Sequence, residues 1–246
     1  MTSPTFTDAG SGHPLLLLHG GGGPQTVAGF AGSLAGHGFR VVTPTHPGFG
    51  GTERPANLET IHGLASIYRR LLDDMDLGDV TIVGNSIGGW IAAELALLHP
   101  NWLTRLVLVD AVGIEVPGHP VADFFSLTFP EIAQLSYHDP ERFRIDPAAL
   151  PEEQRAVLAG NRAALATYTA AGMIDPELRG RLAGIDVPAL VVWGAADRIA
   201  DPVYGRAFAT AIPGAEFALL PETGHLPQLE SPDRLLETIS EFVNRA

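Results

Sequence analysis

A serine flanked by glycines follows a short apolar run in the first half of the sequence. Ser86 lies in Gly-Asn-Ser-Ile-Gly, directly after Val-Thr-Ile-Val and before a stretch with helical spacing. A G-x-S-x-G pattern between a strand and a helix is typical of a nucleophile elbow, which presents a serine hydroxyl at the edge of a sheet. In so tight a turn, Gly84 and Gly88 come too close together to carry side chains. The alternative is an ordinary glycine-rich turn whose serine only caps the helix.

The chain also offers one histidine and one aspartate placed to activate this serine. A serine hydroxyl is a weak nucleophile at neutral pH, so it needs a histidine base and an acid that orients the histidine. His225 follows the last expected strand, and Asp197 follows the strand before it. Functional loops gather at the carboxyl ends of parallel strands, so a sheet would bring both residues to Ser86. We therefore predict Ser86, Asp197 and His225 as a catalytic set, in the chain order expected for such a sheet.

Two other aspartates compete for the role of the orienting acid. Asp110 ends an expected strand over residues 105–110 and would reach the same edge of the sheet. Asp201 is the second alternative to Asp197. Asp197 itself could also serve only as a turn-forming residue, because aspartate side chains hydrogen-bond readily to nearby backbone.

Two histidines near the N-terminal strands also belong to the candidate site. His19 is the rival of His225 as the base, but it opens its loop too early to point at Ser86. We expect His19 to pin that loop by hydrogen bonding instead. His46 lies on the neighbouring loop and is expected to line the substrate pocket.

Four consecutive glycines follow the first buried strand, between His19 and Pro24. A phosphate-binding loop is not favoured, because neither Lys-Ser/Thr nor a G-x-G-x-x-G pattern with a later acid accompanies them. A plain flexible loop is the other interpretation. Attack of a serine on a carbonyl creates an oxyanion that two backbone N–H groups should stabilise. We expect one donor from Ile87 and the other from Gly21, with Gly22 as the alternative.

Strand-like and helix-like segments alternate along most of the chain. The strand-like segments are apolar on both faces, which is typical of a parallel sheet covered by helices on both sides. The alternation stops near residue 113, and helical pieces interrupted by prolines fill the chain until it resumes near residue 188. We predict the α/β class, with a mostly parallel central sheet. A core formed by residues 1–113 and 185–246 would carry an inserted helical cap, residues 114–184, over the edge of the sheet that binds ligands.

The expected elements can be placed by residue number. Residues 1–13 are predicted to be a loose lead-in or a minimal edge strand. The expected strands cover residues 15–18, 39–43, 80–83, 105–110, 188–193 and 216–220, and the expected helices cover residues 25–35, 58–75, 87–98, 202–212 and 232–243.

Composition limits the classes of partner and site. The formal net charge of −13 argues against nucleic acid and anionic membranes, because either partner requires a basic face. The absence of cysteine excludes disulfides, thiolate metal sites and a cysteine nucleophile. No basic, apolar leader and no segment able to span a membrane is visible, so we expect a cytoplasmic protein. The expected partner is a small-molecule substrate; the oligomeric state stays open, a homodimer included.

Together these motifs resemble the α/β-hydrolase superfamily, and the likeness extends over almost the whole chain. The motifs concerned are the glycine loop at residues 19–24, the elbow at residues 84–89, Asp197 in W-G-x-x-D, and Gly-His followed by Glu-Ser-Pro at residues 224–232. The resemblance implies the α/β-hydrolase fold, a Ser-His-Asp triad, an oxyanion hole and a variable cap, without a cofactor or metal. Haloalkane dehalogenases and soluble epoxide hydrolases carry an aspartate at the elbow, so Ser86 argues against both.

Within the superfamily, H-G-G-G-x-P and G-N-S resemble the carbon–carbon bond hydrolases that act on aromatic ring-cleavage products. This likeness implies that Asn85 contacts substrate and that Arg162, or alternatively Arg155, binds a substrate carboxylate. The chain departs from those enzymes at Leu226, where they usually carry an aromatic residue, and it is shorter.

We therefore expect an enzyme that cleaves small, fairly apolar carboxylic esters or lactones through an acyl-enzyme. Phe125 is expected in an apolar pocket under the cap, although lobe packing would explain it as well. Carbon–carbon bond hydrolysis is the alternative reaction. A non-catalytic ligand receptor is the alternative from another class, because one fold can carry unrelated functions.

Overall fold

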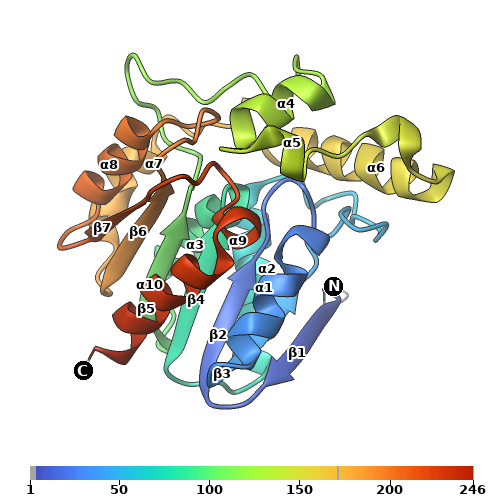
Figure 1. Cartoon of the computed structure of the whole chain (residues 1–246). Helices are drawn as coiled ribbons and strands as arrows, with labels where there is room; N and C mark the ends of the chain where they lie inside the picture. The colour runs from blue at the N-terminus through green and yellow to red at the C-terminus, as the bar shows by residue number, and fades with distance from the viewer. Residues whose placement is uncertain (1–3, 171, 246) are drawn as a thin grey trace.

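The computed structural model describes residues 4–170 and 172–245 and is built on one twisted seven-stranded sheet. The strand order is β1-β3-β2-β4-β5-β6-β7, and helices lie on both faces (Figure 1). All neighbours pair in parallel except β1 and β3. The predicted mostly parallel α/β architecture is thus confirmed. The strands are β1 (Phe6–Gly10), β2 (His13–Leu18), β3 (Phe39–Pro44), β4 (Val80–Asn85), β5 (Leu103–Val109), β6 (Ala189–Gly194) and β7 (Glu216–Leu220).

Alternation of side chains along the strands divides the core into two layers. In β2, Leu16 and Leu18 pack into the layer that contains α2 (Ile61–Asp74), α3 (Ile87–Ala96) and α8 (Pro202–Ala211), whereas Leu15 and Leu17 pack into the layer that contains α1 (Gln25–Ala35) and α10 (Pro232–Asn244). Successive side chains of a strand point to opposite faces, so a strand with apolar residues at every position fits only between two covered faces. This explains why the central strands could be recognised from uninterrupted apolar runs.

The core helices follow the spacing of their apolar residues. Thr60 caps α2 by accepting a hydrogen bond from Gly63 N at 3.0 Å, so this helix begins after the cap and not at residue 58 as expected. The elbow helix α3 is buried on every side and ends two residues before the expected end. The core helices are α1 (Gln25–Ala35), α2 (Ile61–Asp74), α3 (Ile87–Ala96), α8 (Pro202–Ala211), α9 (Pro227–Glu230) and α10 (Pro232–Asn244).

The N-terminal segment forms the edge of the sheet. Strand β1 pairs antiparallel with β3, from Phe6 opposite Pro44 to Gly10 opposite Arg40, and all of its residues are exposed. Its sequence lacks apolar alternation because all of its residues are exposed, which is why the pattern suggested only a lead-in or a minimal edge strand. Residues 1–3 of that expected segment lie outside the described residues.

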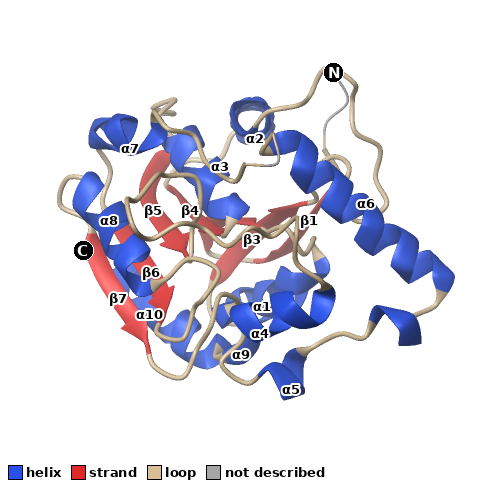
Figure 2. Ribbon diagram, turned by 90° about the horizontal axis from the view of Figure 1, so that it is seen from above, coloured by secondary structure: helices blue, strands red, loops and turns tan. Residues whose placement is uncertain are grey.

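The segment between β5 and β6 lies above the carboxyl ends of the strands (Figures 1 and 2). Its described part contains no strand, only an isolated bridge between Gly113 and Ile174. A capping box at Thr128 and Glu131 begins α4, which explains where the first helix of the segment starts. Its helices are α4 (Phe129–Ser136), α5 (Pro140–Phe143), η1 (Pro147–Ala149), α6 (Glu152–Tyr168), α7 (Leu178–Arg181) and η2 (Leu182–Gly184).

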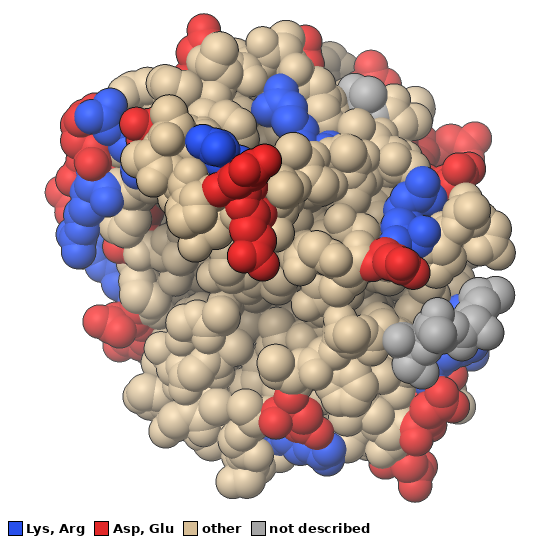
Figure 3. Space-filling view, turned by 90° about the vertical axis from the view of Figure 1, so that its right-hand side faces the viewer, with Lys and Arg blue, Asp and Glu red and all other residues tan. Residues whose placement is uncertain are grey.

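The surface carries both signs of charge. On the face seen in Figure 3, basic side chains are scattered among acidic ones and do not gather into one patch. No helix within the described residues is both long enough and apolar enough to cross a bilayer.

Candidate active site

The chain passes from β4 to α3 through a strained turn at Ser86. The backbone of Ser86 has φ 56° and ψ −120°, a conformation that residues with a side chain rarely adopt. A Cβ atom on Gly84 would lie 2.2 Å from the carbonyl oxygen of Gly88, and one on Gly88 would lie 2.4 Å from the carbonyl oxygen of Leu18. Both glycines are therefore required for the turn, as their spacing around the serine indicated.

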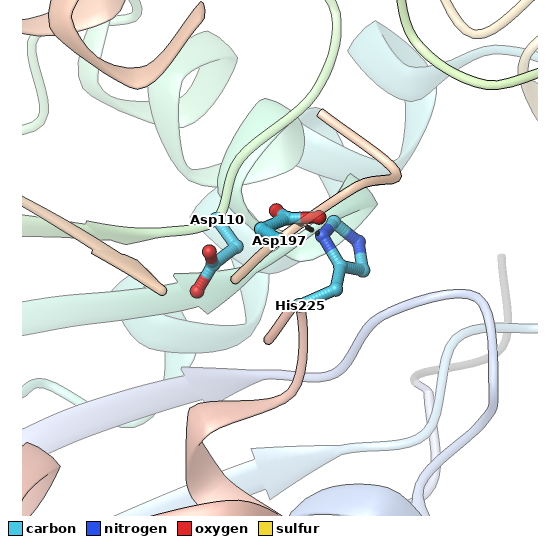
Figure 4. Close-up of side chains that lie close together, drawn as sticks. All are labelled: Asp110, Asp197 and His225. Carbon is cyan, nitrogen blue, oxygen red and sulfur yellow. Dashed lines mark hydrogen bonds and ion pairs between the residues drawn. The ribbon is translucent and has the colours of Figure 1, made fainter. Parts of the chain in front are cut away.

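Three side chains from separate loops meet at this turn. Ser86 Oγ lies 2.9 Å from His225 Nε2, and His225 Nδ1 lies 2.8 Å from Asp197 Oδ2. Figure 4 shows the contact between Asp197 and His225. The exposed fractions are 6% for Ser86, 6% for His225 and 2% for Asp197, so bulk water scarcely reaches the hydrogen bonds. The structure thus brings together the three residues that were selected from the sequence.

The hydrogen-bond partners fix the direction of proton donation along this line. The carboxylate of Asp197 can only accept, so His225 Nδ1 carries the proton and donates it, which leaves Nε2 free to accept from the Ser86 hydroxyl. Asp197 Oδ1 accepts from the backbone N–H groups of Ile199 at 2.8 Å and Ala200 at 3.2 Å. These bonds fix the carboxylate that orients the histidine ring, an arrangement able to activate a serine hydroxyl.

The two competing aspartates have other partners. Asp110 Oδ1 accepts from Gly194 N at 2.8 Å. Asp201 caps α8 through Val203 N and Tyr204 N, and it accepts from His119 at 2.6 Å. Neither is hydrogen-bonded to His225.

Within residues 4–170 and 172–245, Asp110, Asp197 and His225 form the group that could hold a metal ion, with one ligand atom of each within 4.8 Å of the others. The Asp197–His225 hydrogen bond already joins two of these ligand groups. Both oxygens of Asp197 accept N–H groups. Hydrogen bonding therefore accounts for the arrangement of Asp197 and His225.

The glycine loop lies directly against the elbow. A Cβ atom on Gly20 would lie 3.1 Å from the Cβ atom of Ser86. The carbonyl of Gly20 accepts from His19 Nδ1 at 2.8 Å and from Gly23 N at 3.1 Å. In a planar trans peptide the N–H group and the carbonyl group point in opposite directions. Because the Gly20 carbonyl points toward His19 Nδ1, the N–H group of Gly21 points away from His19. Within the described part of the chain, no group accepts from Gly21 N or Ile87 N.

His46 lies behind the glycine loop and does not line the pocket, so that prediction is wrong. Its Nε2 donates to the carbonyl of His19 at 2.8 Å, its Nδ1 accepts from the Tyr68 hydroxyl at 2.5 Å, and its backbone N–H donates to His19 Nε2 at 3.1 Å. Both imidazoles are fully buried and stack with ring centroids 3.7 Å apart. His19 donates through Nδ1 and accepts through Nε2, which requires a neutral imidazole, and burial lowers the pKa of His46 well below its usual range. The expected role of His19 in pinning the loop agrees with these contacts.

Burial lowers the pKa of His19 to about 4, which makes the stability of the fold depend on acid pH. The unfolded chain takes up a proton near pH 6.5 and the folded protein does not until about pH 4, so the free energy of unfolding falls as the pH drops through this window. We expect the loss to be about 3 kcal/mol for this residue. Urea unfolding of the native protein and of His19→Asn at about pH 7.5 and pH 4 would measure it. Equal losses in the two proteins would contradict the assignment.

The side chains expected to contact substrate have partners inside the protein. Asn85 is buried; its Nδ2 donates to the carbonyls of Val109 at 3.3 Å and His225 at 3.2 Å, and its Oδ1 accepts from Gln228 at 3.2 Å. It therefore ties the elbow to the histidine loop, and its contact with substrate stays a prediction. The sequence could not indicate this connection, because the partners are distant backbone carbonyls.

Arg162 is likewise engaged inside the protein, whereas the place of Phe125 in an apolar pocket stays a prediction. Arg162 Nη2 donates to the carbonyls of Phe124, Phe125 and Leu127 at 3.1, 2.7 and 3.2 Å. Its guanidinium also lies 5.4 Å from the ring centroid of Phe124. Phe125 is half-buried against Phe124 and the core beneath. The arginine thus shapes the loop over the site instead of presenting a free charge for a carboxylate.

Helix α4 is attached to both loops that carry the histidine and the aspartate, a feature that sequence reasoning missed. The carbonyl of Ser136 accepts from His225 N at 2.6 Å, and the carbonyl of Leu135 accepts from Arg198 N at 3.1 Å. The last carbonyls of a helix lack partners within it, and here the two loops supply them. The Glu230 carboxylate adds bonds from Gly224 N at 2.6 Å and His138 N at 2.8 Å.

Comparison with known proteins finds relatives along nearly the whole chain. The Alpha/beta hydrolase family profile matches residues 15–238. A 2-hydroxymuconate semialdehyde hydrolase from Pseudomonas putida is 30% identical, over 97% of this chain and 90% of that protein.

Solved structures show the same fold. A thermophilic esterase from Thermogutta terrifontis has a TM-score of 0.76 at 26% identity, covering 97% of this chain and 92% of that chain. A variant of the meta-cleavage product hydrolase from Pseudomonas fluorescens IP01 has a TM-score of 0.77 at 19% identity, covering 98% and 93%. The resemblance seen in the motifs is confirmed, and the chain belongs to the alpha/beta hydrolase family.

Proposed function

We propose that this hydrolase cleaves small carboxylic esters or lactones through an acyl-enzyme on Ser86. The observation that carries the proposal is the continuous line of hydrogen bonds from Ser86 Oγ to His225 and on to Asp197, at 2.9 and 2.8 Å. In this role Ser86 is the nucleophile, His225 the general base and then acid, and Asp197 the group that orients the imidazole.

In the first half of the reaction, His225 Nε2 takes the hydroxyl proton as Ser86 Oγ attacks the substrate carbonyl carbon. The negative charge that develops on the carbonyl oxygen would be stabilised by the backbone N–H groups of Gly21 and Ile87. Neither N–H group donates a hydrogen bond to a described residue. When the tetrahedral intermediate collapses, the bond between the carbonyl carbon and the alkoxide oxygen breaks. The leaving alkoxide takes the proton from His225, and the acyl group stays on Ser86. The same steps with water as the nucleophile then release the acid and restore the serine.

We further propose that residues 114–184 act as a cap that supplies an apolar roof for a small-molecule substrate. Leu165 of α6 reaches over the glycine loop, since a Cβ atom on Gly21 would lie 2.9 Å from its Cδ2. Contacts of this kind exclude water from the oxyanion position, which strengthens the N–H hydrogen bonds there.

An ester or lactone is favoured over a charged keto-acid by the position of the cap arginine. Arg162 donates to three backbone carbonyls through Nη2 and faces an aromatic ring. A charged keto-acid needs a cation to hold its carboxylate in a buried pocket. Arg162 is instead hydrogen-bonded to the backbone of the cap loop.

Carbon–carbon bond hydrolysis is the second candidate, because the relative from Pseudomonas putida is named for 2-hydroxymuconate semialdehyde. The same serine, histidine and aspartate could serve that reaction.

A substrate panel separates the two reactions. The native protein would be assayed with p-nitrophenyl esters of increasing acyl length, simple lactones, and a vinylogous 2-hydroxy-6-oxo-dienoic acid, alongside Arg162→Gln. We expect kcat/KM on the best ester or lactone to exceed that on the dienoic acid by about 100-fold or more, since a missing charge partner costs several kcal/mol. A preference for the dienoic acid that Arg162→Gln abolishes would favour the second candidate.

A further inference from the structure

A second carboxyl group, that of Asp110, lies beside the proposed triad without a role in it. Asp110 follows β5, is fully buried, and has a backbone φ of 44°. Atoms of Asp110, Asp197 and His225 lie within 4.8 Å of one another, and Figure 4 shows the three side chains close together. Two carboxylates this close in a buried site repel one another strongly, so one of them is expected to hold a proton.

The hydrogen-bond donors around the two groups are unequal. Asp197 receives the N–H groups of Ile199 and Ala200 and the Nδ1–H group of His225, so its negative charge is well stabilised. Asp110 receives only Gly194 N on Oδ1. Its Oδ2 is buried, and no described group is hydrogen-bonded to it. An ionised oxygen without a donor is costly in the interior, whereas a protonated one becomes a donor itself.

From this asymmetry we infer that Asp110 is a neutral carboxylic acid that donates a hydrogen bond to the ionised Asp197. The buried cluster then holds one negative charge, and Asp110 acts as a positioning residue for the acid of the triad. The role in catalysis rests on the proposed function, whereas the protonation of Asp110 stands independently of it.

The charges around Asp110 act in the same direction. Burial raises the pKa of the Asp110 carboxyl well above its usual range, and the neighbouring Asp197 raises it further. Glu230, on α9, is the other acidic group whose charge reaches Asp110. Among the described residues, His225 is the titratable base hydrogen-bonded to the pair, and its Nδ1–H group is directed at Asp197.

A neutral Asp110 would benefit the reaction in two ways. Its hydroxyl adds a donor to the carboxylate that faces His225, which holds Asp197 in place while the imidazole gains and loses a proton. It also keeps a second negative charge out of a site in which an oxyanion must form.

Infrared difference spectroscopy tests the protonation directly and requires no substrate. The spectrum of the native protein minus that of Asp110→Asn, at about pH 7.5, should contain the carbonyl stretching band of a protonated carboxylic acid. Asn tolerates the positive φ of this position and keeps a neutral donor, so the variant should fold. Asp201→Asn, which removes a carboxylate bonded to His119, is the control and should give no such band. Absence of the band at Asp110 would overturn the inference.

Activity measurements test the positioning role separately. Asp110→Asn should retain kcat/KM within about 3-fold, because it replaces one neutral donor by another, whereas Asp110→Leu should lose about 10-fold or more with the donor. A loss of about 100-fold or more in Asp110→Asn would mean that Asp110 works as a charged group and would overturn the proposal. If every substrate fails while the infrared band is present, the proposed function fails and the protonated Asp110 stands.

Discussion

Replacing Ser86 by alanine is expected to reduce kcat by about 10⁴–10⁶-fold on the best ester or lactone of the panel. The proposed chemistry passes entirely through its Oγ atom, which lies 2.9 Å from His225 Nε2. The substitution removes one oxygen from a strained turn, so the fold should persist. Steady-state rates measured with enough protein to detect slow turnover, together with the thermal unfolding midpoint, would establish both points.

Ser136→Ala is the matched control for this experiment. Ser136 is also buried and also contacts His225, but it does so through its backbone carbonyl, which accepts from His225 N. Alanine keeps that carbonyl, so activity should stay within about 3-fold. Ser86→Ala protein that keeps more than about 1% of native turnover would contradict the assignment of Ser86 as nucleophile.

Replacing Asp197 by asparagine is expected to lower kcat by about 10⁴-fold. Asn keeps an oxygen that can accept from Ile199 N and Ala200 N, but it can place an NH₂ group opposite His225 Nδ1. The imidazole would then shift its proton to Nε2, which can no longer accept the hydroxyl proton of the serine. Steady-state kinetics and the unfolding midpoint would be compared with those of the native protein.

Asp201→Asn removes the same charge four residues away and serves as the comparison. Its remaining oxygen can still cap α8 through Val203 N and Tyr204 N, so both fold and activity should be preserved. If Asp197→Asn kept a tenth or more of native activity, Asp197 would not be the orienting acid. If instead Asp110→Asn caused the 10⁴-fold loss, the acid would be Asp110.

The sheet and the residues that meet at the elbow could be predicted because local pattern determines both. Uninterrupted apolar runs mark the central strands, Ser86 directly follows one of them, and Asp197 and His225 lie in the loops after the last two strands. In a parallel sheet, the ends of these runs are brought to one edge whatever the rest of the chain does. Strand β1 was the exception, since its exposed residues carry no burial pattern.

The internal hydrogen bonds of Arg162 and Asn85 could not be predicted from the sequence, because they are made to backbone carbonyl groups. Arg162 donates to the carbonyls of residues 124, 125 and 127, and Asn85 donates to that of His225. Any amino acid supplies a carbonyl, so no residue type marks these positions in the sequence. The attachment of α4 to the histidine loop through Ser136 O was hidden for the same reason.

The histidine pair illustrates a different limit. A buried imidazole can serve as a base, a ligand or a satisfied core group, and only its neighbours decide between these roles. Both ring nitrogens of His46 are hydrogen-bonded, Nδ1 to the Tyr68 hydroxyl and Nε2 to the His19 carbonyl, so His46 supports the glycine loop. That outcome depends on contacts between residues more than 20 positions apart in the sequence.

The central claim, that His225 activates Ser86 as a nucleophile, is tested most directly by labelling with a small fluorophosphonate. The native protein and His225→Ala would be treated with the probe, digested and mapped by peptide mass spectrometry. We expect phosphonylation confined to Ser86 in the native protein and lost in the variant, because an unactivated serine hydroxyl reacts too slowly. Labelling at another residue, equal labelling in His225→Ala, or a folded native protein that takes up no probe would contradict the claim.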